Sequence, residues 1–562
     1  MVAQPDKGKG IVLLDKSHYI AGLSKIVADQ EKFELITDDI CRVSWLLEDR
    51  INSFLLKLKN LHHLSSVLYN QLHVSGSGPG TLYGLAKIHK TGFFEEKLYR
   101  PIFAAYKCAS YKLSNFLVNI LAPVAENRYT LKNSAQFRID IEKFPVSGNL
   151  TMASFDIQNL YTNIPLGETI DICLATLGCT LGLPTDLFRK LLELSVFDTM
   201  FAFDGKFYRQ RDGLGMGLPL SPTMANIFLC YHEDIWLQKC PSEFRPVFYR
   251  RYIDDTFALF ENSSHIDKFL KYLNSRHPNM IFTGETESDG KLSFLDCTVQ
   301  KCDNRFSTSV YRKPTFTGLG LSFFSYCPEQ FKLNSINTLI HRAHRICSSF
   351  TAFNKELSFL ADHFFKNGYH KKLYFNLIKK FIAKLSHPMP IVLTAAKMPM
   401  FLSMPYMGIQ SEKLKTEILD CVSESFPQVN LKIIFSNKFT IGSLFKFKER
   451  LPLQLSSSII YNYCCTQCVS STYVGSTVRA LHMRMSEHQG RSYRSGKLAK
   501  NPPFSAIRDH ALKCSKTISL AEFRILGHEN NETYLRIKES IFIRYLKPNL
   551  NEMQSAYPLK IT

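Results

Sequence analysis

The sequence predicts a multidomain protein of the α+β class, and three observations lead to this prediction. The chain has 562 residues, which is enough for three or four domains of ordinary size. Residues 150–315 alternate short apolar runs with turn signals, which favours antiparallel strands, whereas residues 320–385 have a helical and basic pattern. A new pattern begins at residue 456 and indicates a separate small α/β domain.

Composition narrows the class of partner. The formal net charge of +20 predicts a polyanionic partner, with nucleic acid first and acidic lipid as the alternative. The sequence shows no signal peptide and no clean membrane span, which disfavours lipid. Its fifteen cysteines are scattered, so we expect reduced thiols in a nuclear or cytosolic protein that is not secreted.

The elements expected in chain order follow from hydrophobic spacing and turn residues. They are a helix at 41–74, strands at 151–156 and 199–209, hairpins at 247–260 and 281–300, basic helices over 320–385, and a Pro-spotted connector over 386–455.

Acidic residues occur at the ends of two apolar strands. The stretch RRYIDDTFALF (250–260) places Asp254 and Asp255 between apolar flanks, and Asp156 ends the apolar run at 151–156. A plain hairpin turn explains an isolated Asp pair, and unrelated surface aspartates are the alternative for the set. If the two strands lie side by side, the carboxylates converge into the hard oxygen site that Mg²⁺ prefers.

The order of the motifs along the chain resembles that of a known protein family. An acidic strand, the Gly/Pro loop GLGMGLPLSPTMANIFL (213–229) and the YIDD hairpin follow one another as in the palm of reverse transcriptases. Further stretches resemble the reverse transcriptase of Penelope-like retroelements: QPDKGKGIVLLDKSHY (4–19), YGLAKIHK (83–90), RPI (100–102), KLSFLDCTV (291–299), VYRKPTFTG (310–318) and MPYMGIQSEKLKTEIL (404–419).

The resemblance implies a right-hand polymerase. Fingers and the start of the palm would occupy 1–150, a palm with an antiparallel sheet 151–318, a helical thumb 319–385 and a connector 386–455. Asp156, Asp254 and Asp255 would be the catalytic ligands of two Mg²⁺ ions, with Asp255 the more peripheral, and Lys291 a candidate general acid whose alternative is a surface lysine. The residues implied in nucleotide or primer binding are Lys87, Arg100, Tyr161, Met216, Gly217, Ser221, Pro222, Arg312 and Lys313.

The segment 456–562 carries a second set of polar residues. Tyr461 ends one apolar strand, Tyr473 lies in the next, and Arg484 and His488 share one face of an expected helix. With Glu539 and Asn551 further on, the set resembles the GIY-YIG endonuclease domain, although Ile459-Ile460-Tyr461 replaces its first motif. The resemblance implies that Arg484 stabilises the phosphate transition state and that Glu539 holds one Mg²⁺.

Four Cys and His residues in the same segment have spacings found in zinc sites. Cys465 and Cys468 form C-x₂-C, and His510 and Cys514 follow as a second pair. Cys464 could take the place of Cys465. Structural Zn²⁺ and reduced, buried cysteines are both open interpretations at this point.

The resemblance as a whole implies an RNA-directed DNA polymerase fused to a nicking endonuclease. Its partners would be template RNA, target DNA, primer and dNTPs, and it would act in the nucleus without a membrane. Alternatives are a truncated or domesticated copy that only binds nucleic acid, or an endonuclease with a structural N-terminal part. The sequence does not give the oligomeric state.

Overall fold

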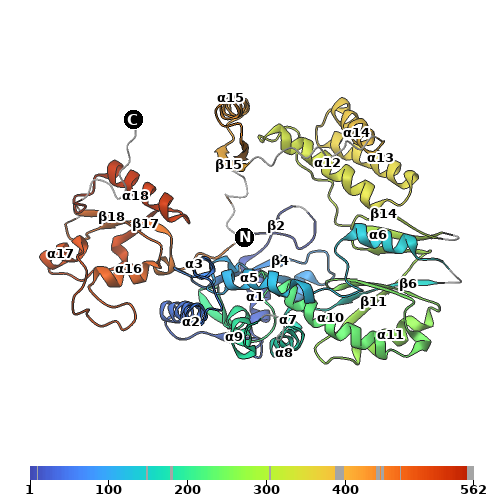
Figure 1. Cartoon of the computed structure of the whole chain (residues 1–562), viewed down its shortest axis with the longest axis horizontal. Helices are drawn as coiled ribbons and strands as arrows, with labels where there is room; N and C mark the ends of the chain where they lie inside the picture. The colour runs from blue at the N-terminus through green and yellow to red at the C-terminus, as the bar shows by residue number, and fades with distance from the viewer. Residues whose placement is uncertain are drawn as a thin grey trace.

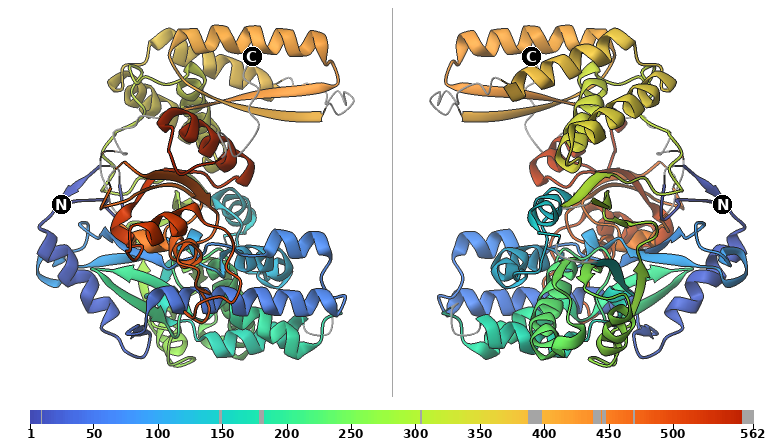
Figure 2. Two further views of the ribbon diagram at one scale, coloured as in Figure 1. Left: turned by 90° about the vertical axis from the view of Figure 1, so that its left-hand side faces the viewer. Right: turned by 90° about the vertical axis from the view of Figure 1, so that its right-hand side faces the viewer.

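The computed structural model describes residues 1–8, 10–146, 150–177, 182–302, 305–386, 398–437, 444, 448–468 and 470–552. Figure 1 shows a large body in the lower part of the view, a helical bundle at the upper right, a small α/β unit at the top and a module at the left. Figure 2 shows from both sides that the α/β unit lies beside the bundle.

The N-terminal part, the expected fingers, is built on a five-stranded sheet of order β3-β8-β7-β4-β5. Aromatic side chains from several strands, including Phe33, Phe103 and Phe201, form its core. The elements are β1 (Val2–Ala3), β2 (Val12–Leu13), α1 (Lys16–Val27), β3 (Phe33–Leu35), α2 (Ile40–Asn60), α3 (Ser66–Leu72), β4 (Gly80–Ala86), α4 (Phe93–Glu96), β5 (Tyr99–Phe103), α5 (Tyr111–Leu121) and α6 (Ser134–Lys143).

Two elements predicted in this part as single are each divided in two in the structure. The single helix expected at 41–74 is two helices, because His62 has a positive φ of 60° and the Ser65 side chain caps the second helix. The single strand expected at 199–209 is the hairpin β7 (Thr199–Phe203) and β8 (Lys206–Gln210). Asp204 and Gly205 both have positive φ, which is the backbone of a tight two-residue hairpin turn.

The palm is a four-stranded antiparallel sheet of order β11-β6-β10-β9 that is buried on both faces. Phe155 and Phe260 pack against the helices of one face, and Met152 and Phe257 pack against α6 and a second small sheet on the other. The elements are β6 (Thr151–Ile157), α7 (Leu160–Asn163), α8 (Leu166–Leu177), α9 (Thr185–Val196), α10 (Ser221–Lys239), β9 (Phe248–Tyr252), β10 (Asp255–Phe260), α11 (Ser264–Asn274) and β11 (Phe282–Thr286).

The strand at 151–156 and the hairpin at 247–260 are confirmed by β6 and by the β9–β10 pair. The hairpin expected at 281–300 is wrong, because β11 joins the palm sheet beside β6. The hairpin in this region is β12 (Lys291–Phe294) with β13 (Cys297–Cys302), and β14 (Arg305–Val310) completes the second sheet. The positive φ angles of Asp289 and Gly290 separate β11 from β12.

The expected thumb consists of three helices around a core that contains Ile340, Phe364 and Tyr374: α12 (Glu329–Ile346), α13 (Phe350–Lys366) and α14 (Lys371–Ser386). The connector that follows is partly folded. Its described residues form β15 (Met398–Pro405), α15 (Ile409–Ser425) and β16 (Val429–Ser436), with the two strands parallel. The alternating exposure along VNLKIIFS, residues 429–436, is the period of a strand.

The C-terminal module, described over 456–552, has a three-stranded sheet of order β18-β17-β19 with helices packed around it. It contacts α2 of the fingers, where Arg494 pairs with Asp49 at 2.7 Å and Tyr493 meets Trp45 edge-on. Its elements are β17 (Ile459–Cys464), β18 (Thr472–Thr477), α16 (Leu481–His488), α17 (Ala506–Lys513), β19 (Phe523–His528) and α18 (Glu532–Leu546).

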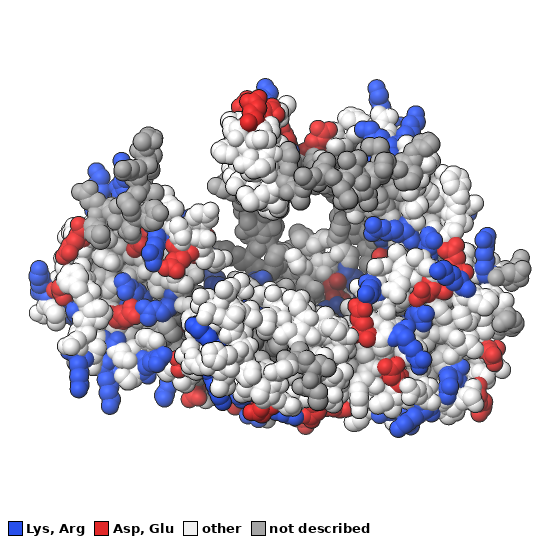
Figure 3. Space-filling model, in the orientation of Figure 1, with Lys and Arg blue, Asp and Glu red and all other residues white. Residues whose placement is uncertain are grey.

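Across the described ranges of the chain, the helices all lack either the length or the apolar character that crossing a membrane requires. Figure 3 shows Lys and Arg side chains spread over the bundle at the upper right, the palm below it and the C-terminal module.

Candidate active sites

Three carboxylates meet at one end of the palm sheet. Strand β10 runs antiparallel to β6, and Asp255 stands directly opposite Asp156. Asp254 lies in the β9–β10 turn, where its carbonyl accepts a hydrogen bond from the Ile157 N–H at 3.3 Å. Residue Ile253 of that turn has a φ of 55°, a strained conformation for a β-branched residue that is typical of functional sites. The turn hypothesis and the metal-site hypothesis for the Asp pair are therefore compatible.

The expectation that Asp255 is peripheral is wrong, since the register places it beside Asp156. The electrostatics agree with this placement. Burial and the neighbouring Asp254 raise the pKa of Asp156, and burial with both other carboxylates raises the pKa of Asp255 to about 6. All three side chains stay reachable by solvent at the sheet end. Crowded hard oxygen donors that repel one another are a donor set that fits Mg²⁺.

Cations from the fingers and from the segment after the palm face these carboxylates. Lys7, Lys90 and Arg100 lower the pKa of Asp156, and Lys313 with Lys7 lowers that of Asp255. The N-terminal loop that carries Lys7 is pinned to β4, because the Asp6 N–H donates to the Ala86 carbonyl at 2.8 Å. Lys313 thus lies near the carboxylates, and its role at the primer end stays a prediction.

The sequence interpretation missed Lys7 and Lys90. Both lie in stretches that resemble the Penelope-like reverse transcriptase, but the resemblance gives nucleotide-binding roles only to Lys87 and Arg100. Burial and Arg100 lower the pKa of Lys87, which places these two cations close together. Arg100 also pairs with Asp6, Nε to Oδ1, at 2.9 Å. The signal available in the sequence was the lysine between Asp6 and Gly8 in QPDKGKG.

The loop before α10 is anchored to the fingers. The Met216 carbonyl accepts a hydrogen bond from the Phe103 N–H at 2.8 Å, and the Ser221 hydroxyl donates to the Gly215 carbonyl at 2.7 Å. Gly217 has a φ of 134°, and a Cβ there would lie 2.0 Å from the Phe103 carbonyl oxygen, so only glycine fits. Pro222 occupies the first turn of α10, where a missing N–H costs nothing.

Tyr161, the predicted steric residue, lies near the palm carboxylates. It is part of α7, and its carbonyl accepts a hydrogen bond from the Leu214 N–H at 2.6 Å. Burial and Asp254 raise the pKa of the Tyr161 phenol, so the ring lies close to the carboxylates.

Two predicted site residues lie elsewhere or are already engaged. Lys291 starts β12 at the other end of the palm sheet, next to Glu287, whose N–H donates to the Met152 carbonyl. Four residues of strand separate Met152 from Asp156, or about 13 Å, which excludes Lys291 as the general acid in this arrangement. Arg312 forms a bidentate ion pair with Glu356 of α13 and stacks on Phe359, so it joins palm and thumb.

The C-terminal module has a hydrogen-bonded cluster around Tyr461. The Tyr461 hydroxyl lies 2.8 Å from His488 Nε2 and accepts a hydrogen bond from Arg484 Nε at 3.2 Å. Glu487 holds Arg484 through Nη1 at 3.0 Å and also contacts Arg479. Burial lowers the pKa of His488 to about 3 and raises that of Tyr461, so both are neutral near pH 7. The predicted grouping of Tyr461, Arg484 and His488 is present.

Ser505 is a member of this cluster that the sequence interpretation missed. Its hydroxyl lies 2.8 Å from His488 Nδ1 and, as the N-cap of α17, accepts the Arg508 N–H at 3.2 Å. A buried serine hydroxyl satisfies its own hydrogen by donating to Nδ1. His488 then carries its proton on Nε2 and donates to Tyr461, which leaves the tyrosine hydrogen for another acceptor.

Tyr473, Glu539 and Asn551 complete the second site. A Cβ on Gly475 would lie 2.6 Å from the Tyr461 hydroxyl and 2.7 Å from the Tyr473 ring, so glycine is needed between the two tyrosines. Glu539 accepts a hydrogen bond from the Ser476 hydroxyl at 2.8 Å, and burial raises its pKa. The Asn551 side chain accepts a hydrogen bond from the Val474 N–H and donates one to its carbonyl, so it fixes the segment after α18 to β18.

The predicted Cys and His set comes together. One ligand atom from each of Cys465, Cys468, His510 and Cys514 lies within 4.8 Å of the others. Cys468 Sγ is 3.3 Å from Cys465 Sγ and 3.1 Å from His510 Nε2, and none of the four cysteines at 464–468 and 514 is in a disulfide. Cys464 lies outside this group. Three sulfurs and one imidazole at these separations fit a tetrahedral Zn²⁺ site.

Comparison with known proteins identifies two regions. The family model described as reverse transcriptase (RNA-dependent DNA polymerase) matches residues 88–282. The model described as animal helix-turn-helix domain matches residues 320–379, which cover α12, α13 and part of α14. No curated protein matches the chain.

Solved structures that resemble the chain include three polymerases at low identity. A Candida albicans telomerase with a fragment of telomeric RNA has a TM-score of 0.44 at 9% identity, covering 69% of this chain and 66% of that one. Apo telomerase from Candida tropicalis has a TM-score of 0.36 at 12% identity, with the same two coverages. The Sicinivirus 3Dpol RNA-dependent RNA polymerase has a TM-score of 0.33 at 13% identity, covering 56% and 71%.

The chain thus spans just under two thirds of the length of the telomerase chains that it resembles. The family match covers the fingers strand β5, the loop before α10 and all three palm carboxylates. Residues 88–282 therefore match a reverse transcriptase domain, and their architecture is mixed α/β.

Proposed function

We propose that the protein is an RNA-directed DNA polymerase joined to a DNA-nicking endonuclease, as in Penelope-like retroelements. The main support is the convergence of Asp156, Asp254 and Asp255 at one sheet end inside the reverse transcriptase domain, opposite the fingers cations. A nucleic-acid-binding descendant has no need for a carboxylate cluster that raises its own pKa values. The cluster favours the catalytic proposal over that alternative.

In the polymerase site, the protein's own residues hold the substrates. Lys87 and Arg100 would grip the triphosphate of the incoming nucleotide, because charge-assisted contacts stabilise negative charge in phosphoryl transfer. Tyr161 would exclude the ribose 2′-hydroxyl by its bulk, so dNTPs are the proposed substrates. Asp156, Asp254 and Asp255 would hold two Mg²⁺ ions, which when bound supply charge stabilisation for the attacking and leaving oxygens.

The position of Lys313 near Asp255 supports its proposed role at the primer end. Met216 and Gly217 lie on the anchored loop before α10, which supports their role as the floor under the nucleotide and template. Arg312 would act on the primer indirectly, by fixing the segment 310–318 to the thumb.

In the C-terminal module, the proposed reaction is hydrolysis of one DNA phosphodiester. Arg484 would stabilise the charge of the transition state, and the Tyr461 hydroxyl, hydrogen-bonded to His488, would orient or deprotonate the attacking water. Glu539 would hold one Mg²⁺ that supplies Lewis-acid assistance when bound. Cys465, Cys468, His510 and Cys514 would bind a structural Zn²⁺.

The two activities suit one sequence of events. The nick would expose a 3′-hydroxyl on target DNA, and the polymerase would extend this primer on template RNA. Such target-primed synthesis requires access to chromosomal DNA, so we propose action in the nucleus.

The deciding experiment is primer extension on RNA with Mg²⁺, run beside nicking of a supercoiled plasmid. Extension with dNTPs and conversion to nicked circles are both expected. Nicking without extension would leave an endonuclease with a structural polymerase fold. Binding without either reaction would indicate a domesticated nucleic-acid-binding protein.

A further inference from the structure

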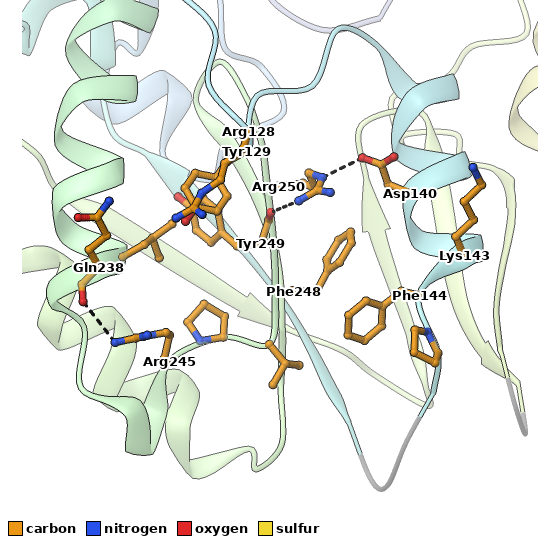
Figure 4. A pocket seen from close by; sticks show the side chains of 14 residues that line it. Arg128, Tyr129, Asp140, Lys143, Phe144, Gln238, Arg245, Phe248, Tyr249 and Arg250 are labelled. Atoms are coloured by element: carbon orange, nitrogen blue, oxygen red, sulfur yellow. Dashed lines mark hydrogen bonds and ion pairs between the residues drawn. The ribbon is translucent and has the colours of Figure 1, made fainter.

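A cavity of about 570 Å³ lies at the outer edge of the palm (Figure 4), and its lining residues belong to neither candidate active site. It lies along β9, the edge strand of the palm sheet, between α6 and the end of α10. Phe248, on its wall, is six residues from Asp254, or about 20 Å of extended chain. The volume lies in the usual range for ligand pockets.

Cations dominate the polar lining: Arg128, Lys143, Arg245 and Arg250 against the single acid Asp140. Arg250 Nε contacts Asp140 at 2.8 Å, its Nη1 donates to the Tyr249 carbonyl at 3.0 Å, and it lies over the Phe248 ring. Asp140 is therefore already neutralised, and the Arg250 guanidinium is held in one orientation.

Arg245 is also held in place by its own chain. Its Nε donates to the Cys240 carbonyl at 3.1 Å. Its Nη2 donates to the Gln238 carbonyl at 3.3 Å, as Figure 4 shows. A guanidinium has five N–H donors, so both fixed arginines keep donors that can face the cavity. Fixed planar donors match the geometry of phosphate better than mobile lysines do.

The remaining cations have no ion pair within the described ranges of the chain. Arg128 and Lys143 are exposed, and the Arg128 guanidinium lies over the Tyr129 ring at 4.7 Å. Tyr129 and Phe144 are only half-buried, so parts of two aromatic rings line the cavity beside four cations. This combination of basic and aromatic side chains is typical of surfaces that bind single-stranded nucleic acid.

We propose that this cavity binds one or two nucleotides of a single strand that lies outside the polymerase duplex. All four cations, Arg128 included, contact the phosphates, and a base stacks on Tyr129 or Phe144. An acidic peptide would satisfy the cations but would leave the aromatic faces without a matching partner, which favours nucleic acid. The site is additional to the catalytic cleft and does not require that the polymerase or the nuclease be active.

The test measures binding at this second site with the cleft occupied. The full-length protein is saturated with a primer–template whose primer ends in a dideoxynucleotide, together with the next dNTP, and a fluorescent octauridine is then titrated. The double variant Arg128→Glu/Lys143→Glu is expected to bind octauridine about tenfold more weakly or worse. Its log–log salt slope should fall by about 1.4, since each lost phosphate contact on a single strand removes about 0.7.

The matched control is Lys132→Glu/Lys271→Glu, which makes the same charge change at exposed lysines outside the cavity. It should bind octauridine like the parent protein. Octauridine with 4-thiouridine should crosslink to Tyr129 or Phe144 in the parent protein.

Equal losses in both double variants, or crosslinks confined to other segments, would overturn the proposal. So would displacement of octauridine by an octaglutamate peptide at equal concentration, which would indicate a protein ligand. Unchanged thermal unfolding of the variants shows that a loss of binding is local. Because binding is the readout, an inactive polymerase would disprove the proposed function without affecting this result.

Discussion

The two candidate active sites differ in how their charged and polar groups are arranged. The palm site presents three carboxylates that repel one another at an open sheet end, with cations reaching in from other segments. The site of the C-terminal module is closed and prearranged: Tyr461 is fully buried, and Ser505, His488, Tyr461 and Arg484 form a continuous hydrogen-bonded chain. The carboxylates of the palm site repel one another, whereas the polar groups of the module's site are already hydrogen-bonded to one another.

This difference shows where each site depends on its surroundings. The palm cluster needs opposite charge to bring its carboxylates together, so it should respond strongly to metal and pH. The module's network needs an intact small fold, so it should respond to anything that loosens that fold or redirects a proton. The predictions below test this contrast, from the largest expected effect to the smallest.

Replacing Asp254 should have the largest effect on synthesis. Asp254→Ala should lower primer extension by about 10³-fold or more, because a metal ligand acts in the chemical step. Template–primer binding and plasmid nicking should persist, which gel shift and nicking assays measure. Asp267→Ala, at an acid in the first turn of α11, is the control and should extend normally. Normal extension by Asp254→Ala would remove this residue from the site.

Breaking the Cys/His group should remove nicking through loss of the fold. Cys514→Ser should release stoichiometric zinc, unfold the module and lower nicking by about 10³-fold, because small folds depend on their structural metal. Extension from an annealed primer should continue. Metal analysis and limited proteolysis measure the two losses, with Cys421→Ser, at an exposed cysteine of α15, as control. A folded, zinc-free Cys514→Ser module would show that these cysteines are merely reduced neighbours.

Removing Arg484 should stop nicking without unfolding the module. Arg484→Ala should reduce nicking by about 10²- to 10³-fold, since it removes a group that stabilises transition-state charge. Primer extension should be nearly unchanged, because the two sites share no ligands. Arg491→Ala, at an arginine just beyond α16, is the control. Normal nicking by Arg484→Ala would turn the module into a DNA-binding appendage.

Substitutions at Ser505 should show whether nicking depends on which His488 nitrogen carries the proton or only on how the ring is held. Ser505→Thr keeps both the helix cap and the hydroxyl donor, so it should nick like the parent. Ser505→Asp keeps the cap but can only accept a hydrogen bond, so it should move the His488 proton to Nδ1 and lower nicking by about 10²-fold. Nitrogen NMR of His488 reports the tautomer. Equal nicking by the two variants would contradict a role for the proton position.

The smallest effect concerns the stability of the metal-free palm. The pKa of Asp255 is raised to about 6, so its ionised form destabilises the fold above that pH, and the penalty disappears as pH falls from 6 towards 4. Asp255→Asn should therefore have a higher free energy of unfolding than the parent at pH 7.5, by about 1 kcal/mol after screening at this solvent-reachable site. Thermal or urea unfolding measures the difference. The two proteins should converge near pH 4. A variant that is less stable at pH 7.5 would contradict the repulsion argument.

His488 provides the opposite sign in the other site. Its pKa is lowered to about 3, so the folded module keeps it neutral and loses stability as pH falls from about 6.5 towards 3. Lowering the pH should therefore reduce the repulsion that destabilises the palm, while it lowers the free energy of unfolding of the C-terminal module.

The strands that carry the three palm carboxylates could be predicted from the sequence. The apolar runs around Asp156 and around Asp254–Asp255 are long enough to specify β6 and the β9–β10 hairpin, and the spacing of Cys465, Cys468, His510 and Cys514 specified a compact group. These signals are local, because strand periodicity and ligand spacing are properties of a few consecutive residues. The ordered motifs also predicted the polymerase domain.

The tertiary structure alone decided which partners meet. Asp255 faces Asp156 because β10 pairs with β6 in one register, and Lys291 is far away because β11, not β12, pairs with the other edge of β6. Lys7 reaches the palm site from a loop that lies more than a hundred residues before Asp156. Ser505 reaches the second site from the N-terminus of another helix. No periodicity in the sequence marks either residue. Register and long-range packing depend on the summed burial of whole faces, so local patterns cannot fix them.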